Sequence, residues 1–219
     1  MGAFGALLAR FQTHLESIYG VRVSEHVEDY LLTQEHFARV RPESRVPEEL
    51  LVQQDDDGVS LGLYIAPEVQ EPLSRPQPAL NLLIGKHLPQ YCVAAEGVSH
   101  WLYLQHRAGF DSQVSQLELE VQAEVDKFAS CALGLWQLGV PHLVNRLRAR
   151  LFDGVRYFAH LGSEERERYA TANRLARGYA GFLERRFLLQ RDRDGFLREL
   201  RFAFRLAGGE KYAHLATVG

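Results

Sequence analysis

The stretch LLVQQDDDGVSLGLYI, residues 50–65, decides the fold class that the sequence predicts. The Asp-Gly pair at 57–58 separates two apolar runs, and apolar residues alternate along the second run from Val59 to Ile65. Glycine accepts the positive φ that a tight turn between antiparallel strands requires, so the pattern predicts a β-hairpin. A two-stranded ribbon is only marginally stable in water, and this one must therefore pack against helices or a third strand.

The sequence on both sides of this hairpin predicts helices or connecting chain. Before it, apolar residues recur at helical spacing over 4–18, and Gly20 supplies a stop, which predicts a first amphipathic helix. A short second helix is expected over 24–32, because serine at its start is a favourable N-cap residue. After the hairpin, residues 66–80 contain four of the eight prolines and are expected to form a connector.

From residue 80 onward the pattern is mainly helical. Residues 89–106 are expected to form one helix, although the alternation of aromatic residues with leucines also allows a strand over 99–106. Ser115 and Glu118 form a capping-box pattern at the start of a long helix, which Gly139 and Pro141 would end. Further helices are expected at 142–160, 164–189 and 194–206, with Ser163 and Asp194 as N-caps and Gly208-Gly209 as the final stop.

These patterns together predict an α+β fold that is predominantly helical. N-terminal helices and a small β-hairpin are followed by a helical bundle. We expect an acidic α/β portion over 1–79, which holds the hairpin 50–65, and a helical portion over 80–219 that is basic from residue 141. The two portions are expected to form one compact unit, because the connector between them is short.

The composition excludes several classes of protein. The chain has 219 residues, of which 46% are hydrophobic and 24% are charged, as is typical of a globular protein. No run approaches the roughly 18 consecutive apolar residues of a membrane span, and the N-terminus has no basic leading segment. Two cysteines are too few for a disulfide framework. We therefore expect a cytoplasmic protein without a membrane partner.

The net charge of −3 conceals an asymmetry along the chain. Residues 1–140 hold 9 Lys and Arg against 19 Asp and Glu, whereas residues 141–219 hold 16 against 9. Fifteen of those 16 cations are arginines, whose planar guanidinium suits phosphate or carboxylate. The asymmetry is also compatible with attraction between the two halves of the chain, or with the abundance of arginine that a GC-rich genome produces, and these two explanations together carry more weight.

The arginine-rich helices supply a nucleic-acid-binding hypothesis. Several arginines follow the helical i, i+3 and i, i+4 spacing, so that they share a face and could neutralise successive phosphates. Aromatic residues lie between them and could stack on bases, although such residues more often belong to a core. The candidate residues are Arg174, Arg177, Arg185, Arg186, Arg198, Arg201 and Arg205.

A set of carboxylates and one histidine supplies a metal-binding hypothesis. Glu96 and His100 are four residues apart, as are Glu120 and Glu124, so on helices each pair shares a face. If the two helices form an antiparallel pair, the four side chains meet at one level, where they suit a divalent metal ion. The Glu-x-x-x-His spacing differs from the Glu-x-x-His motif of known di-metal bundles. The alternative is a solvated or salt-bridged face, in which Glu124 pairs with Lys127.

Three functions remain open at this point. The sequence lacks the common catalytic motifs, and it implies no cofactor other than the possible divalent metal. The leading hypothesis is a non-enzymatic binding or adaptor protein that contacts another protein or itself. The alternatives are a nucleic-acid-binding module and a metal-dependent enzyme.

Overall fold

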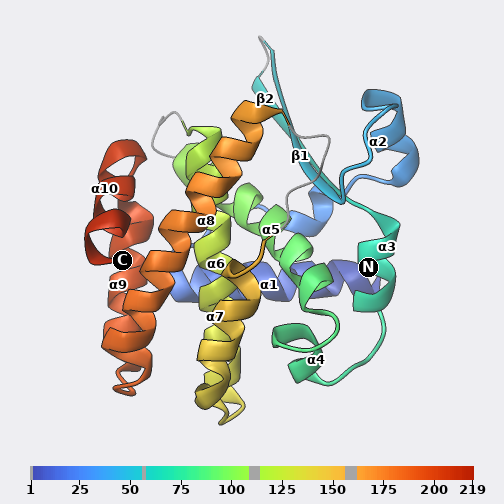
Figure 1. Cartoon of the computed structure of the whole chain (residues 1–219). Coiled ribbons are helices and arrows are strands. Elements are labelled where there is room, and N and C mark those ends of the chain that lie inside the picture. The colour runs from blue at the N-terminus through green and yellow to red at the C-terminus, as the bar shows by residue number, and fades with distance from the viewer. Residues whose placement is uncertain (1, 56–57, 109–113, 156–161) are drawn as a thin grey trace.

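The computed structural model describes residues 2–55, 58–108, 114–155 and 162–219 (Figure 1). Helices dominate, and the strands form one two-stranded antiparallel sheet, so the predicted α+β, predominantly helical class is confirmed. The elements in chain order are α1 (Ala3–Tyr19), the 3₁₀ turn η1 (Val27–Tyr30), α2 (Gln34–Val40), β1 (Glu48–Asp55), β2 (Gly58–Ile65), α3 (Pro67–Leu73), α4 (Ala79–Leu83), α5 (Leu88–Ala108), α6 (Gln116–Gln137), the 3₁₀ turn η2 (Pro141–Leu143), α7 (Val144–Phe152), α8 (Ser163–Leu183), the π-helical turn η3 (Glu184–Leu188), α9 (Arg193–Arg205) and α10 (Gly208–Val218).

The predicted hairpin is present, and one of its ends is buried. Residues pair from Glu48 with Ile65 at that end to Asp55 with Gly58 at the turn. Leu63 and Ile65 are buried against α5, whereas Val52 lies exposed nearer the turn. Figure 1 shows the far end of the two strands extending beyond the helices. The hairpin therefore obtains the helical support that a two-stranded ribbon needs.

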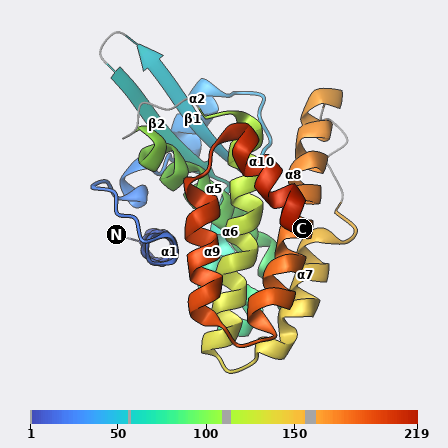
Figure 2. The same cartoon turned by 90° about the vertical axis from the view of Figure 1, so that its left-hand side faces the viewer.

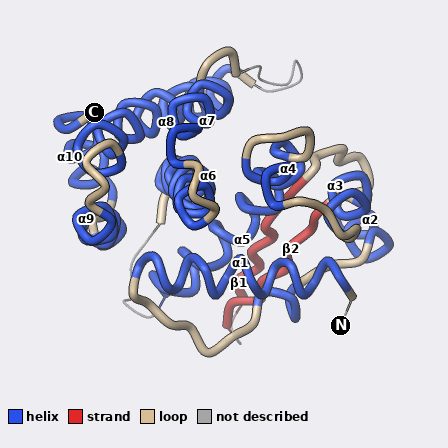
Figure 3. Tube along the Cα trace, turned by 90° about the horizontal axis from the view of Figure 1, so that it is seen from below, coloured by secondary structure: helices blue, strands red, loops and turns tan. Residues whose placement is uncertain are grey.

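The first helix follows its sequence pattern closely. α1 ends at Tyr19, and Gly20 adopts φ 65°, the left-handed C-cap conformation that favours glycine. The helix runs across α5 (Figure 3) and also packs against α9. Arg201 of α9 donates hydrogen bonds to the carbonyl oxygens of Ser17 and Ile18 at the C-terminus of α1. A cation at this position stabilises the negative end of a helix dipole.

Helices α5 and α6 form an antiparallel pair at the centre of the molecule. Residues 99–106 are helical, so the preferred prediction for that segment is confirmed. Ser115 caps α6 by accepting a hydrogen bond from the backbone N–H of Glu118. The reciprocal half of the expected capping box is replaced, because the Glu118 carboxylate accepts bonds from Tyr103 and the backbone N–H of Gly208.

Several local predictions were wrong. The second helix is only the single turn η1, and the helix α2 that follows was not predicted. The expected connector 66–80 contains α3 and the beginning of α4. Pro67 lies in the first turn of α3, where a proline is compatible with a helix, and Pro78 is the N-cap residue of α4. Asp192, not Asp194, caps α9.

The expected stop at Gly208 is instead the beginning of a further helix, α10. This helix packs against α8 and α9 (Figure 2). Gly208 adopts φ 46°, so the pair of glycines permits a change of direction and does not end the structure.

One hydrophobic core joins the two ends of the chain. Its buried residues extend from Phe4 in α1 to Leu215 in α10 and include Trp101 and Phe128 of the central pair. Within the described part of the chain, every helix is too short or too polar to cross a bilayer.

Candidate metal centre

The central helix α6 carries polar side chains on two faces. Residues 120, 124 and 127 lie on one face, and residues 118, 122 and 126 lie on the other, each set at helical spacing. Both sets are shielded from water to a large extent, since Glu118, Glu120, Gln122, Asp126 and Lys127 are all buried. The alternative prediction is therefore wrong in its solvated form, and each face needs partners within the protein, as its salt-bridged form requires.

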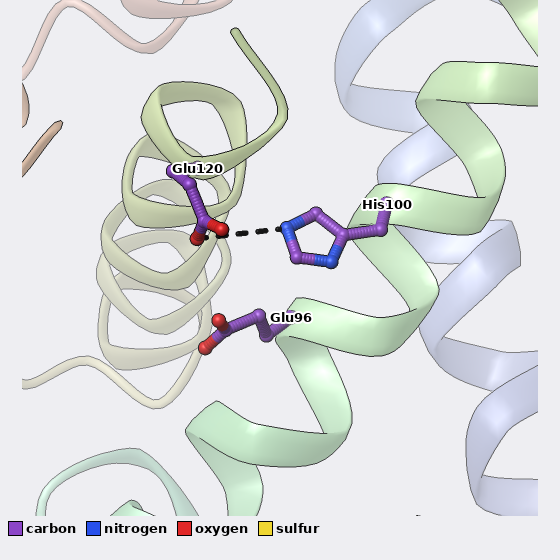
Figure 4. A group of neighbouring side chains, drawn as sticks. All are labelled: Glu96, His100 and Glu120. Carbon is purple, nitrogen blue, oxygen red and sulfur yellow. Dashed lines mark ion pairs between the residues drawn. The ribbon is translucent and has the colours of Figure 1, made fainter. Parts of the chain in front are cut away.

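The first face meets α5 at the predicted site. Glu96, His100 and Glu120 each offer one ligand atom, and these atoms lie within 4.8 Å of one another. Figure 4 shows the imidazole of His100 pointing from α5 toward Glu120 on α6, with Glu96 one helical turn away. The Nε2 atom of His100 is 4.0 Å from Oε2 of Glu120, too far for a hydrogen bond. Three of the four predicted ligands therefore converge.

A fourth carboxylate, which the sequence did not suggest, comes from the hairpin. Oε1 of Glu48 lies 3.7 Å from Nδ1 of His100, and the Glu48 side chain is 9% exposed. The residue Gly97 of α5 explains this approach. A Cβ atom built on Gly97 would lie 2.8 Å from Leu63 and 3.1 Å from Cγ of Glu48. The missing side chain lets the base of the hairpin close onto α5, which carries Glu48 to His100.

The fourth predicted ligand, Glu124, has a different partner. The ammonium of Lys127 lies 2.7 Å from Oε1 of Glu124 and 3.1 Å from Oε2 of Glu96. The pairing of Glu124 with Lys127 was the alternative weighed from the sequence, and it forms inside the protein. Glu96 consequently takes part in this ion pair and is also one of the three possible metal ligands, which we call the metal-competent trio: Glu96, His100 and Glu120.

A second cation borders the group from α8. Nε of Arg168 lies 3.9 Å from Oε1 of Glu120. We call the whole group the Glu/His cluster: Glu48, Glu96, His100, Glu120, Glu124, Lys127 and Arg168. It contains four carboxylates but only two permanently charged cations, so acid is in excess unless protons or a metal ion compensate.

The pKa values show how protons compensate for this excess. Burial alone would lower the pKa of His100, but the carboxylates of Glu48, Glu120 and Glu96 outweigh it and raise the value to about 9. Burial raises the pKa of Glu120 to about 7, against the opposing effect of His100. Burial also raises the pKa of Glu48. Near neutral pH the cluster therefore holds protons that a bound cation would displace.

Three buried atoms of the cluster lack hydrogen-bond partners. They are Nε2 of His100, Oε1 of Glu48 and Nε of Arg168, and the side chains of His100 and Glu48 are about nine-tenths buried. A buried polar atom without a hydrogen-bond partner costs free energy. The side chains of the cluster therefore do not satisfy one another fully by hydrogen bonds. Metal–ligand distances of about 2.0–2.2 Å require the donors to lie about 3 to 4 Å apart, a contraction that rotation of the glutamate side chains can supply.

The second face of α6 forms a different polar group, the Lys211 network. Lys211 of α10 donates to Oη of Tyr103 at 2.9 Å and to Oε1 of Gln122 at 2.6 Å. Asp126 accepts hydrogen bonds from Ser99, Gln122 and Tyr19. The network comprises Tyr19, Ser99, Tyr103, Glu118, Gln122, Asp126 and Lys211, and among the described residues none of these seven has a buried side-chain atom without a partner.

The arginines of the nucleic-acid hypothesis lie on α8, η3 and α9. Arg201 is engaged with the C-terminus of α1, and Arg177 forms a 2.8 Å ion pair with Asp153. The remaining five are exposed: Arg174, Arg185, Arg186, Arg198 and Arg205. Six of the seven side chains face solvent and could reach a nucleic acid. Exposure alone does not test binding, so the nucleic-acid hypothesis stays a prediction.

No protein-family model, curated protein or solved structure matches this chain. The functional argument therefore rests on the chemistry of its own residues.

Proposed function

We propose that this protein binds a divalent metal ion through Glu96, His100 and Glu120, with Glu48 next to Nδ1 of His100, where its carboxylate can orient the ring. The observation that carries this proposal is the buried imidazole of His100. Its Nε2 atom has no hydrogen-bond partner and points toward two carboxylates of a cluster that holds more acids than cations. A metal ion would satisfy that nitrogen and replace the protons that now compensate the excess acid.

The ligand set indicates the kind of metal. Two carboxylates and one imidazole are mainly hard oxygen donors with one nitrogen, which suits Mn²⁺, Fe²⁺ or Zn²⁺ better than soft ions such as Cu⁺. If these three side chains bind the ion, a coordination position remains for water or substrate. Metal-assisted hydrolysis is the reaction class that such an arrangement would serve.

The test is metal analysis of the purified protein, followed by calorimetric titration of the chelator-treated protein with Mn²⁺ and Zn²⁺. We expect one ion per chain in the wild type. Glu120→Gln should lose most of the affinity, because an amide is a weaker and uncharged ligand. Glu167→Gln is the matched control, since Glu167 is an exposed acid on α8, one residue before Arg168, and should titrate as the wild type does. A wild-type protein that binds neither ion would refute the proposal.

The adaptor and nucleic-acid hypotheses remain predictions from the sequence. The metal hypothesis is preferred because it accounts for a specific buried group, whereas exposed arginines are common on protein surfaces.

A further inference from the structure

The Glu/His cluster has two levels along the α5–α6 pair. His100 and Glu120 face each other at the first level, with their nearest atoms 4.0 Å apart. Glu124 and Lys127 lie about one helical turn further along α6, opposite Glu96. Glu96 borders both levels, because it belongs to the metal-competent trio and also contacts the ammonium of Lys127 at 3.1 Å.

The second level resembles a cation site that is already filled. Nζ of Lys127 lies between two carboxylates, 2.7 Å from Glu124 and 3.1 Å from Glu96, and the residue is 7% exposed. The carboxylates of paired helices can hold two metal ions about 3.5–4 Å apart that share a ligand. Here the shared ligand is Glu96, and a lysine ammonium supplies the positive charge at the second position.

We propose that the Lys127 ammonium takes the place of a second metal ion, so that the wild-type centre is mononuclear and loss of the ammonium opens a second cation site between Glu96 and Glu124. This inference rests on the proposed function, because it assumes that the first level binds a metal. A tethered ammonium cannot dissociate and does not accept a ligand. It therefore supplies one positive charge between the two carboxylates while it excludes a second ion.

Removing the ammonium should create a strong demand for another cation. Glu96 and Glu124 would remain next to each other in a largely buried site, each without its principal counter-charge. Such carboxylates must take up protons or bind a cation. Because the truncated side chain also leaves room for an ion, a divalent metal is the expected replacement.

The experiment is native mass spectrometry of chelator-treated protein after equilibration with Zn²⁺. We expect one zinc per chain for the wild type and two for Lys127→Ala. Lys127→Arg keeps the charge and should bind one. The double variant Lys127→Ala with Glu124→Gln removes a ligand of the new site and should return to one. Lys127→Gln is the second test variant if Lys127→Ala does not fold. It should also bind two, because glutamine ends one atom short of the position of the ammonium and its amide oxygen can bind the ion.

The outcomes separate the two proposals. One zinc in the wild type, together with one in a folded Lys127→Ala or Lys127→Gln variant, would overturn the inference and leave the proposed function intact. Two zinc ions in the wild type would also overturn it, because the ammonium would then not exclude the second ion. A wild type without zinc would overturn both.

Discussion

The two polar groups on opposite faces of α6 differ in how well they are satisfied. In the Lys211 network, every buried side-chain atom of the seven named residues has a hydrogen-bond partner, and only Nε of Arg107, which borders the network at Glu118, lacks one. The Glu/His cluster has comparable burial but leaves Nε2 of His100, Oε1 of Glu48 and Nε of the bordering Arg168 without hydrogen-bond partners. Burial of polar groups therefore does not by itself indicate a functional site. A functional site is indicated when buried groups also have unpaired ligand atoms and uncompensated charge.

The largest expected effect is on stability, in the Lys211 network. Asp126→Ala removes the acceptor of Ser99, Tyr19 and Gln122, leaving buried donors without partners. We expect the free energy of unfolding to fall by about 3–5 kcal/mol, as is usual when one member of a buried charged network is lost. Urea denaturation measures this loss, and the metal stoichiometry of the folded variant should stay at one. Loss of metal from a folded Asp126→Ala protein would mean that the two groups are not independent.

The corresponding change in the Glu/His cluster should affect both metal binding and stability. His100→Ala removes the nitrogen ligand, and we expect metal affinity to fall by about 100-fold or more, because the effect should exceed that of losing an outer-shell partner. Titration calorimetry with Zn²⁺ measures it. Stability in the absence of metal should also fall near neutral pH, because burial is outweighed by the neighbouring carboxylates, which raise the pKa of His100 to about 9 and so favour its charged form in the folded state. A folded His100→Ala protein that binds Zn²⁺ as tightly as the wild type would show that His100 is not a ligand.

The free energy of unfolding should depend on pH through Lys211, the cation of the Lys211 network. Burial lowers the pKa of Lys211 from 10.5 to about 7, although Glu118 and Asp126 oppose the shift and Arg107 adds to it. Between these two values the unfolded chain carries a proton that the folded chain lacks, so this residue makes stability rise with pH.

Lys211→Met provides the measurement. Relative to this variant, the wild type should gain about 2 kcal/mol in unfolding free energy between pH 7 and pH 9. Lys86→Met is the control, because Lys86 is exposed, and its difference from the wild type should not vary with pH. A constant difference for Lys211→Met would show that the ammonium remains charged inside the protein.

The smallest effect tests how the hairpin reaches the cluster. Gly97→Ala would crowd Leu63 and Glu48, and we expect a loss of about 1–2 kcal/mol in stability together with weaker metal binding. Gly134→Ala is a matched control, because its added Cβ would lie 2.7 Å from Leu83, outside the Glu/His cluster. That variant should lose similar stability and bind metal as the wild type does. Equal metal affinity in both variants would exclude a contribution of Glu48 to metal binding.

Local sequence patterns correctly predicted the elements that depend on residues close together in the chain. The Asp-Gly turn, the apolar stripe before Gly20 and the Ser115 cap each predicted a feature that the structure contains. They succeed because backbone geometry, capping and helical period act between residues close in sequence. The predictions failed at proline-rich and glycine-rich segments, where α3, α4 and α10 form because tertiary packing outweighs weak local preferences.

The candidate site was predicted in part for the same reason. The i, i+4 spacing of Glu96 with His100 and of Glu120 with Glu124 placed each pair on a helix face, and an antiparallel pairing was enough to bring three of the four together. No spacing rule could include Glu48, which lies more than forty residues from any of them in the sequence.

Local sequence is therefore sufficient to predict the helical periods, the hairpin and the residue types that can bind a metal. Tertiary packing determines which acids are buried. It also places the ammonium of Lys127 between Glu96 and Glu124, and brings Glu48 to the cluster beside Gly97. The physical reason is that burial and charge compensation depend on surfaces brought together from distant parts of the chain, and local sequence carries no direct record of those contacts.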